Sequence, residues 1–165
     1  MLIGPPTAGK SSVGPLLAAA LGVPFADTDK LVAMAAHKPV SDIFVDDGEL
    51  VFREFERGAV ARGLDAVKPE GGVLALGSGA VLDLDVRRML VGQVIVYLEA
   101  EFATVAKRTG MDRPRVVLPG NPRGQLRAML EERRPVYADL ATLTVSTDDL
   151  APEEVAADLV ERLRV

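Results

Sequence analysis

The chain contains no cysteine and only one histidine, His37. Disulfide bonds, cysteine nucleophiles and thiolate zinc sites are therefore excluded, as are metal centres built from several histidines. A Ser-His-Asp hydrolase is disfavoured, because a single histidine would have to serve it. The chemistry must rely on carboxylates, lysine, arginine, hydroxyl groups, backbone amides and a hard cation. A chain without cysteine is compatible with a reducing compartment, and we expect a cytoplasmic protein.

Long hydrophobic runs are also missing, since no apolar stretch approaches the roughly 18 residues that suggest a membrane span. The first residues, Met-Leu-Ile-Gly-Pro-Pro, lack the basic region and apolar core of a signal peptide. The 165 residues are 48% apolar and 26% charged, which is typical of a globular domain rather than a disordered chain. We expect one domain over residues 1–165, monomeric and without a membrane partner.

An overall positive charge is absent as well, because the net charge is −5. Between Lys107 and Arg134, however, eight basic residues accompany three acidic ones, so this segment carries +5. A basic segment in an acidic protein argues against general nucleic-acid binding and favours a small polyanionic ligand. A solvated helix face rich in arginine is the alternative.

Short apolar segments alternate with longer segments of helical periodicity. The expected strands are 1–3, 23–27, 71–79, 93–100 and 142–146, and the expected helices are 10–22, 28–36, 47–66, 101–110, 125–134 and 151–165. Helices between strands predict a three-layer αβα sandwich with a five-stranded parallel sheet. A ligand is then expected at the carboxyl ends of the strands. Pro15 falls inside the first helix, where we expect a local distortion.

Gly4, followed after four positions by Gly9-Lys10-Ser11, fits the phosphate-loop pattern G-x-x-x-x-G-K-[ST] between a strand and a helix. Backbone N–H groups in such a loop surround phosphates, lysine reaches the β- and γ-phosphates, and serine is suited to Mg²⁺. The loop therefore predicts that the protein binds a nucleotide. A glycine-rich turn that merely caps a helix is the alternative.

Two carboxylates follow the second expected strand. Asp27 and Asp29 flank Thr28, and residues two apart in extended backbone point the same way. One carboxylate is suited to a water on magnesium, and the other to a proton from a substrate hydroxyl. Capping of the next helix by Asp27 or Thr28 is the alternative.

Arg53 and Glu56 are three residues apart on an expected helix, where Glu49 can join them. A guanidinium held by carboxylates presents a rigid fork to a ligand carboxylate, although an ordinary surface ion pair has the same spacing. The glycines around Ser78 end the central strand and either admit a ligand close to the backbone or form a tight turn.

The basic segment contains a loop rich in proline, "MDRPRVVLPGNPRG", with Arg113 and Arg115. An arginine on a mobile loop is suited to closing over a γ-phosphate. Arg133 and Arg134 follow at the end of the next expected helix, where they can also complement the helix dipole.

The order of these motifs resembles the shikimate kinases over nearly the whole chain: GxxxxGKS, DTD, F-R-x-x-E, a glycine-rich turn, R-T-G…R-P and R-x-P-x-Y. The resemblance implies a kinase of the nucleoside-monophosphate-kinase type, with a core of residues 1–109 and 123–165 and a mobile lid at about 110–122. It implies transfer of the γ-phosphate of ATP, with Mg²⁺, to the 3-hydroxyl of shikimate, a step toward chorismate and the aromatic amino acids.

The resemblance also implies roles for individual residues. Those matching the ATP site are Thr7, Ala8, Gly9, Lys10, Ser11, Ser12, Arg108 (beside adenine) and Arg113 (in the lid). Those matching the magnesium site are Ser11 and Asp27. Those matching the shikimate site are Asp29 (at the reacting hydroxyl), Arg53 and Arg133 (on the carboxylate), Gly77, Ser78 and Gly79, with Glu56 orienting Arg53. Lys10, Asp29 and Arg113 are the implied catalytic residues.

The family turn normally has three glycines, whereas this chain has Gly77-Ser78-Gly79. Serine would be strained if this position required a positive φ, but its amide would still serve in the β region. Two other functions remain open: a related kinase for another hydroxy acid such as gluconate, and an inactive ATP-binding homologue. A GTPase is disfavoured, because no N-K-x-D motif is present.

Overall fold

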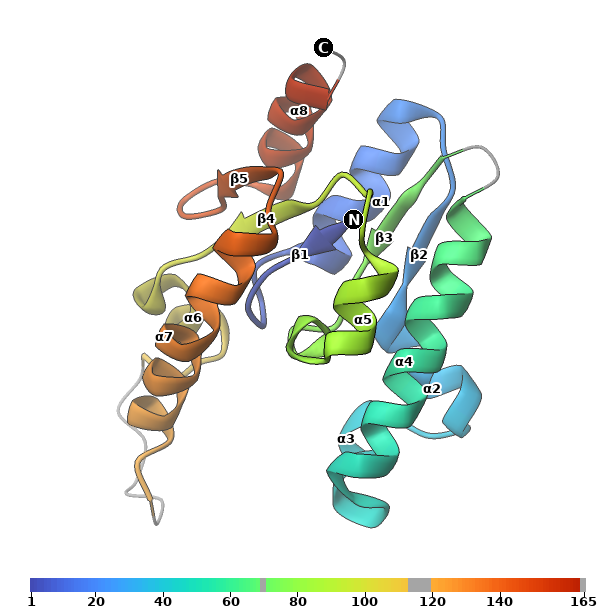
Figure 1. Ribbon diagram of the computed structural model, residues 1–165. Helices are drawn as coiled ribbons and strands as arrows, with labels where there is room; N and C mark the ends of the chain where they lie inside the picture. The colour runs from blue at the N-terminus through green and yellow to red at the C-terminus, as the bar shows by residue number, and fades with distance from the viewer. Residues whose placement is uncertain (69–70, 113–119, 164–165) are drawn as a thin grey trace.

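The computed structural model describes residues 1–68, 71–112 and 120–163, and its centre is a parallel sheet of five strands (Figure 1). The strand order is β2-β3-β1-β4-β5. The strands are β1 (Leu2–Ile3), β2 (Phe25–Asp27), β3 (Val73–Ala75), β4 (Val96–Glu99) and β5 (Leu143–Ser146). The predicted five-stranded parallel sheet is confirmed.

Eight α-helices and one 3₁₀ turn accompany the strands in the described part of the chain. The helices are α1 (Lys10–Leu21), α2 (Thr28–Ala36), α3 (Val40–Asp46), α4 (Gly48–Val67), α5 (Leu84–Met89), α6 (Phe102–Arg108), α7 (Pro122–Leu140) and α8 (Pro152–Leu163), and the turn is η1 (Ala80–Leu82). Within the described residues, none of these helices is both long and apolar enough to cross a membrane.

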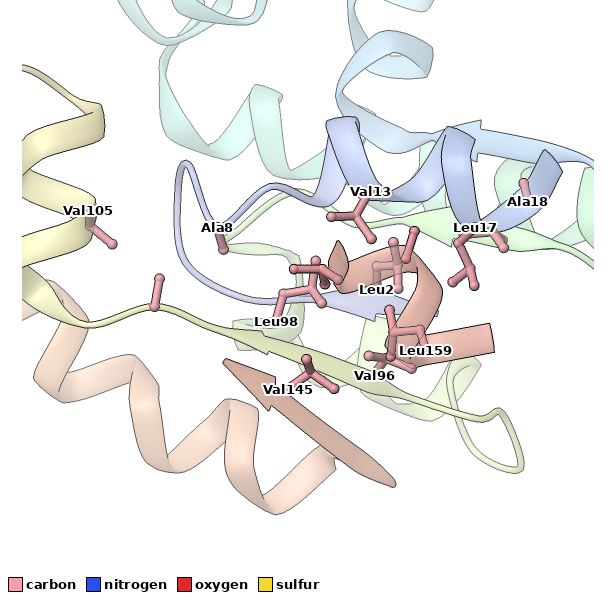
Figure 2. Packing of buried hydrophobic residues seen from close by; sticks show 14 of the residues in the cluster. Leu2, Ala8, Val13, Leu17, Ala18, Val96, Leu98, Val105, Val145 and Leu159 are labelled. Atoms are coloured by element: carbon pink, nitrogen blue, oxygen red, sulfur yellow. The ribbon is translucent and has the colours of Figure 1, made fainter. Parts of the chain in front are cut away.

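Side chains alternate between the two faces of the sheet, and both faces are covered. Leu2 and Val96 face the cluster formed with α1 and α8, whereas Ile3 and Tyr97 face the cluster formed with α4, α5 and α7. Figure 2 shows the first cluster, in which Leu17 of α1 and Leu159 of α8 lie over the strands. Burial on both faces gives the three-layer αβα arrangement that the sequence predicts.

The first strand is short and lies at the centre of the sheet, between β3 and β4 (Figure 1). Leu2 and Ile3 are each only 1% exposed. Hydrogen bonds join β1 to the chain on both sides. The Leu76 N–H donates to the Leu2 carbonyl (3.0 Å), and the Val96 N–H donates to the Met1 carbonyl (2.8 Å). Burial and flanking strands therefore hold a segment that is too short to be stable alone.

Four details differ from the prediction. Helices α3 and α5 were not predicted; Ile43 of α3 packs in a small cluster with Val32 and Phe52, and Val86 of α5 packs in the cluster that contains Ile3. Helix α1 continues past Pro15, which is exposed, so the proline at which we expected a local distortion does not end the helix. Helix α7 runs to Leu140 instead of ending near residue 134.

Helix α7 continues because its second half is anchored by packing. Pro135 removes one helical hydrogen bond but is exposed, so water can satisfy the free carbonyl. Tyr137, 1% exposed, then buries its ring against Tyr97 of β4. Arg133 and Arg134 therefore lie inside the helix, and their expected position at its end is wrong.

Candidate active site

The phosphate loop joins β1 to α1 at the carboxyl edge of the sheet. Gly9 has φ 97° and precedes the first residue of the helix, and no side chain among the described residues caps that end. The free N–H groups of the first helical turn therefore face the loop, as an anion site requires. The alternative of a mere helix cap is disfavoured, because the lysine of the pattern is drawn into the same loop.

Lys10 is enclosed by the loop and only 9% exposed. Its ammonium donates hydrogen bonds of 2.8 Å to the carbonyls of Gly4 and Pro5. Burial lowers the pKa of Lys10 to about 8, and the charges of Asp29 and Asp27 oppose this shift. The Lys10 ammonium and the carboxylates of Asp27 and Asp29 therefore lie close together in a small space.

Thr7 lies in the left-handed region with φ 59°, which a β-branched residue rarely adopts. Its carbonyl accepts a hydrogen bond of 3.0 Å from Arg108 of α6. The strained turn of the loop is therefore tied to the segment that precedes the expected lid.

Asp27 ends β2 and serves two partners. Its Oδ2 accepts a hydrogen bond of 2.6 Å from the Ser11 hydroxyl, and its Oδ1 accepts one of 3.0 Å from the Asp29 N–H. Asp27 therefore caps α2, which is one of the two alternatives from the sequence, and its other oxygen atom also reaches the phosphate loop.

Asp29 lies in the first turn of α2 and faces the same space. Burial raises the pKa of Asp29, the negative charge of Asp27 raises it further, and the charge of Lys10 lowers it. Asp29 lines a cavity of about 430 Å³ whose other lining residues are Pro6, Thr7, Gly9, Lys10, Ser11, Ser12 and Ser78. The carboxylate and the phosphate loop thus share one cavity.

Arg53 of α4 is held by two carboxylates. Its Nη1 donates to Glu56 Oε2 (2.5 Å), and its Nη2 donates to Glu49 Oε1 (3.2 Å). Glu56 is only 2% exposed, and burial raises its pKa while the Arg53 charge lowers it. This is not the ordinary surface pair that the spacing alone allows, because a buried carboxylate fixes the guanidinium.

The glycine turn packs tightly against these charged groups. A Cβ atom at Gly77 would lie 2.7 Å from Asp29 Oδ1 and 2.9 Å from Glu56 Oε1. A Cβ atom at Gly79 would lie 2.7 Å from Arg53 Nη1. Ser78, between them, is not among the residues with a positive φ, so a side chain fits there without backbone strain.

Two hydroxyl groups that the sequence reasoning missed hold this turn. Thr28 is fully buried, and its Oγ1 accepts a hydrogen bond of 2.8 Å from the Gly77 N–H. The Tyr137 hydroxyl donates one of 2.5 Å to the Ser78 carbonyl. Both residues lie inside motifs singled out in the sequence, DTD and R-x-P-x-Y, which is the only signal that pointed to them.

Arg133 lies one helical turn before Tyr137 on α7 and is half-buried. Its positive charge contributes to lowering the pKa of Lys10, after the larger effect of burial. Helix α7 therefore brings Arg133 to the side of the site that Lys10 and Ser78 occupy. Arg134, in contrast, pairs with Glu101 at 3.1 Å and lies apart from them.

A second cavity, of about 280 Å³, adjoins the phosphate loop. It is lined by Thr7, Ala8, Gly9, Ser12, Val13, Arg108, Thr147, Leu150, Pro152 and Val155. The Arg108 guanidinium donates to the Thr147 carbonyl (2.6 Å) and hydroxyl (3.1 Å). Thr147, which sequence reasoning did not single out, thus orients Arg108 on the wall of this cavity.

Some expected residues cannot be placed. Arg113 and Arg115, and with them most of the expected lid at 110–122, lie outside the described residues. Every other predicted site residue lies around the phosphate loop, the 77–79 turn or the two cavities. These groups come from the carboxyl ends of β1, β2 and β3 and from helices that follow β1 to β4, as expected for a parallel sheet.

Known proteins resemble this chain over almost its whole length. The family model for shikimate kinase matches residues 6–164. The shikimate kinase of Thermobifida fusca (strain YX) is 52% identical over 162 residues, which cover 98% of this chain and 92% of that protein. The shikimate kinase of Salinispora arenicola (strain CNS-205) is 47% identical over 163 residues, covering 99% and 96% of the two chains.

A solved structure agrees with these relatives. The shikimate kinase from Acinetobacter baumannii in complex with shikimate has a TM-score of 0.86 and 30% identity, and the match covers 99% of this chain and 90% of that chain. The family match starts inside the phosphate loop and reaches the end of the described residues, so it includes every helix and strand from α1 to α8. On this evidence the chain belongs to the shikimate kinase family.

Proposed function

We propose that the protein transfers the γ-phosphate of ATP to the 3-hydroxyl of shikimate, giving ADP and shikimate 3-phosphate. One observation carries the proposal beyond family membership: Lys10, Ser11 and Asp29 line a single cavity. A phosphate-binding loop and a carboxylate suited to a hydroxyl group then act on the same reacting atoms. Phosphoryl transfer depends mainly on such positioning and on neutralising charge.

On the donor side, residues 7–12 would hold the phosphates of ATP. The N–H groups at the start of α1 are suited to the β-phosphate, and Lys10 supplies a positive charge to the β- and γ-phosphates. The cavity beside Arg108 has apolar walls of Leu150 and Pro152, which suit a flat base. Arg108 would lie against adenine there.

The residues present also fit a magnesium ion. Ser11 and Asp27 place two oxygen atoms within hydrogen-bond distance of each other, and Mg²⁺ prefers oxygen ligands. Among the described residues, no group of three or more His, Asp or Glu side chains forms a cage. Ser11 would therefore bind the ion directly and Asp27 through water, which matches an ion held largely by phosphates and water. When bound, Mg²⁺ neutralises charge on the β- and γ-phosphates.

On the acceptor side, Arg53 and Arg133 would bind the carboxylate of shikimate, and the 77–79 turn would face its ring. Asp29 would accept a hydrogen bond from the 3-hydroxyl. As the hydroxyl oxygen bonds to the γ-phosphorus, the bond to the β,γ-bridging oxygen breaks and its electron pair leaves with ADP. Asp29 takes the hydroxyl proton, and the raised pKa of Asp29 makes its carboxylate a better proton acceptor.

Arg113 is also part of this proposal, on the basis of the sequence. An arginine in the lid would contact the γ-phosphate and exclude water during transfer. An Arg113→Ala variant is then expected to lose kcat while shikimate affinity is kept. We further propose that the protein is a cytoplasmic monomer, and light scattering on the purified protein tests its mass.

A kinase for another hydroxy acid such as gluconate is the alternative that the shikimate kinase relatives disfavour, although Arg53 and Arg133 would bind any carboxylate. A coupled assay for ADP, with shikimate, gluconate or no acceptor, separates the possibilities. We expect ADP release that depends on shikimate. Equal ADP release without acceptor would contradict the proposal, and ATP binding without any shikimate binding would indicate an inactive homologue.

A further inference from the structure

The R-x-P-x-Y segment contains a tyrosine to which the proposed reaction assigns no role. Tyr137 is 1% exposed, and its hydroxyl donates a hydrogen bond of 2.5 Å to the Ser78 carbonyl, 59 residues away in sequence. We propose that Tyr137 is a positioning residue for the acceptor, because its hydroxyl fixes the 77–79 turn relative to the helix that carries Arg133. This inference rests on the proposed function, since it concerns how the same acceptor is held.

The turn is held from two sides at neighbouring peptide groups. Thr28 of α2 binds the Gly77 N–H, and Tyr137 of α7 binds the Ser78 carbonyl. Gly79 then lies against the guanidinium of Arg53. The two hydroxyls therefore set the distance between three acceptor-facing parts: the Asp29 end of α2, the turn and α7.

The tyrosine ring is fixed independently of its hydroxyl. It stacks on Tyr97 of β4 with ring centroids 5.2 Å apart and belongs to the core cluster that contains Ile3 and Val81. A phenylalanine ring would fill this space equally well. The hydroxyl is therefore unnecessary for packing, and its described partner is a carbonyl of the acceptor turn.

Arg133 depends on the same contact. It lies four residues before Tyr137, so both side chains are on the same face of α7. Pro135 lies between them and has no N–H to donate, which weakens the helix at this turn. Burial raises the pKa of Tyr137 and the Arg133 charge lowers it, which agrees with the closeness of the two groups. Losing the hydroxyl would let Arg133 and the turn shift apart.

A Tyr137→Phe variant tests the inference, with Tyr97→Phe as the matched control. Tyr97 is 3% exposed and belongs to the same ring pair, and no hydrogen bond in the described structure joins its hydroxyl to the turn. We expect Tyr137→Phe to raise the KM for shikimate about three- to tenfold, the range of one neutral hydrogen bond. The KM for ATP and kcat should change less than about twofold. Tyr97→Phe should leave the KM for shikimate unchanged.

The outcomes are distinguishable. An unchanged KM for shikimate in Tyr137→Phe, with an active wild type, overturns this inference alone. Equal changes in both KM values together with a lower Tm also overturn it, because a merely structural residue would act in that way. A wild type that releases no ADP in response to shikimate overturns the proposed function and this inference with it.

Discussion

The guanidinium of Arg53 lies against Gly79 so closely that a Cβ atom there would be 2.7 Å from Nη1 and 2.9 Å from Nη2. Arg53 is also fixed by Glu56, which accepts a hydrogen bond from Nη1. We propose that the Arg53 guanidinium binds the substrate carboxylate. Its position therefore depends on the absence of a side chain at Gly79 as well as on the ion pair with Glu56. Ser78, one residue earlier, has room for its side chain and requires no positive φ.

Gly79→Ala is expected to weaken shikimate binding without unfolding the protein. The added methyl group would push the end of a flexible side chain rather than backbone, so the cost in stability is small but Arg53 moves. We predict a KM for shikimate raised about tenfold or more, as for a lost charge-assisted hydrogen bond. The KM for ATP and the Tm should stay close to wild type.

Gly58→Ala provides the control for that substitution. Gly58 also lies on the Arg53 helix, but a Cβ atom there would only touch Arg62 Nη1 at 3.8 Å. It should raise stability by up to about 1 kcal/mol through helix propensity and leave both KM values unchanged. A similar loss of shikimate affinity in both variants would contradict the role assigned to Gly79.

Asp29→Asn is expected to lower kcat about 100-fold or more, because asparagine cannot take the hydroxyl proton. The side chains are of similar size, so the fold should survive and ATP should bind normally. Single-turnover kinetics with saturating shikimate measure the effect. An unchanged kcat would remove Asp29 from the reaction.

The same variant should be more stable than the wild type at neutral pH. Burial raises the folded-state pKa of Asp29 above its ordinary value of 3.8, so the unfolded chain releases the proton first as pH rises. Stability is therefore lost as pH rises from 3.8 through the folded-state pKa, and the uncharged asparagine of the variant would avoid this loss. Thermal unfolding should show a higher Tm for the variant at about pH 7, with a gap that narrows toward pH 4. A Tm difference between variant and wild type that stays constant with pH would argue against a raised pKa of Asp29.

Arg53→Ala is expected to raise the KM for shikimate about 10- to 100-fold and to lower stability by about 1–3 kcal/mol, because Glu56 loses a charged partner while buried. Arg53→Lys should give a KM for shikimate between those of the wild type and Arg53→Ala, since lysine keeps the charge but not the planar fork. Adding Glu56→Gln to Arg53→Ala should restore stability but not shikimate affinity. Recovery of both would mean that Arg53 serves the fold alone.

ADP affinity should fall as pH rises through about 8, the pKa of buried Lys10. Below that pH the ammonium is charged and assists the phosphates, and above it the charge is lost. Titration calorimetry should show about tenfold weaker ADP binding near pH 9.5 than near pH 7. Shikimate affinity should not change over this range, because arginines keep their charge. Constant ADP affinity would mean that Lys10 stays protonated.

Local patterns predicted much of the fold and site. The phosphate loop follows β1, Asp27 ends β2 and Asp29 follows it, so neighbouring residues determine both the element and the place of each side chain. Helix α3 and the end of α7 were not predicted, because packing of Ile43 and Tyr137 decides them and proline at 135 suggests a stop. Tertiary burial outweighed local propensity in both cases.

Contacts between distant segments could not be predicted. The hydrogen bonds from Gly77 to Thr28 and from Tyr137 to Ser78 join residues 49 and 59 positions apart. The sequence also left two alternatives for Ser78, and only the backbone geometry excludes the strained one. The reason for glycine at 77 and 79 is likewise spatial, since the side chains of Asp29, Glu56 and Arg53 occupy the space that a Cβ would need.

The most direct test is to identify the product. Phosphorus and proton NMR of a reaction containing the protein, MgATP and shikimate should show one new phosphate monoester, coupled to the proton on carbon 3 of the ring, in step with ADP. Inorganic phosphate as the only new phosphorus signal beside ADP, or a monoester on another hydroxyl, would contradict the arrangement in which Asp29 meets the 3-hydroxyl at the phosphate loop.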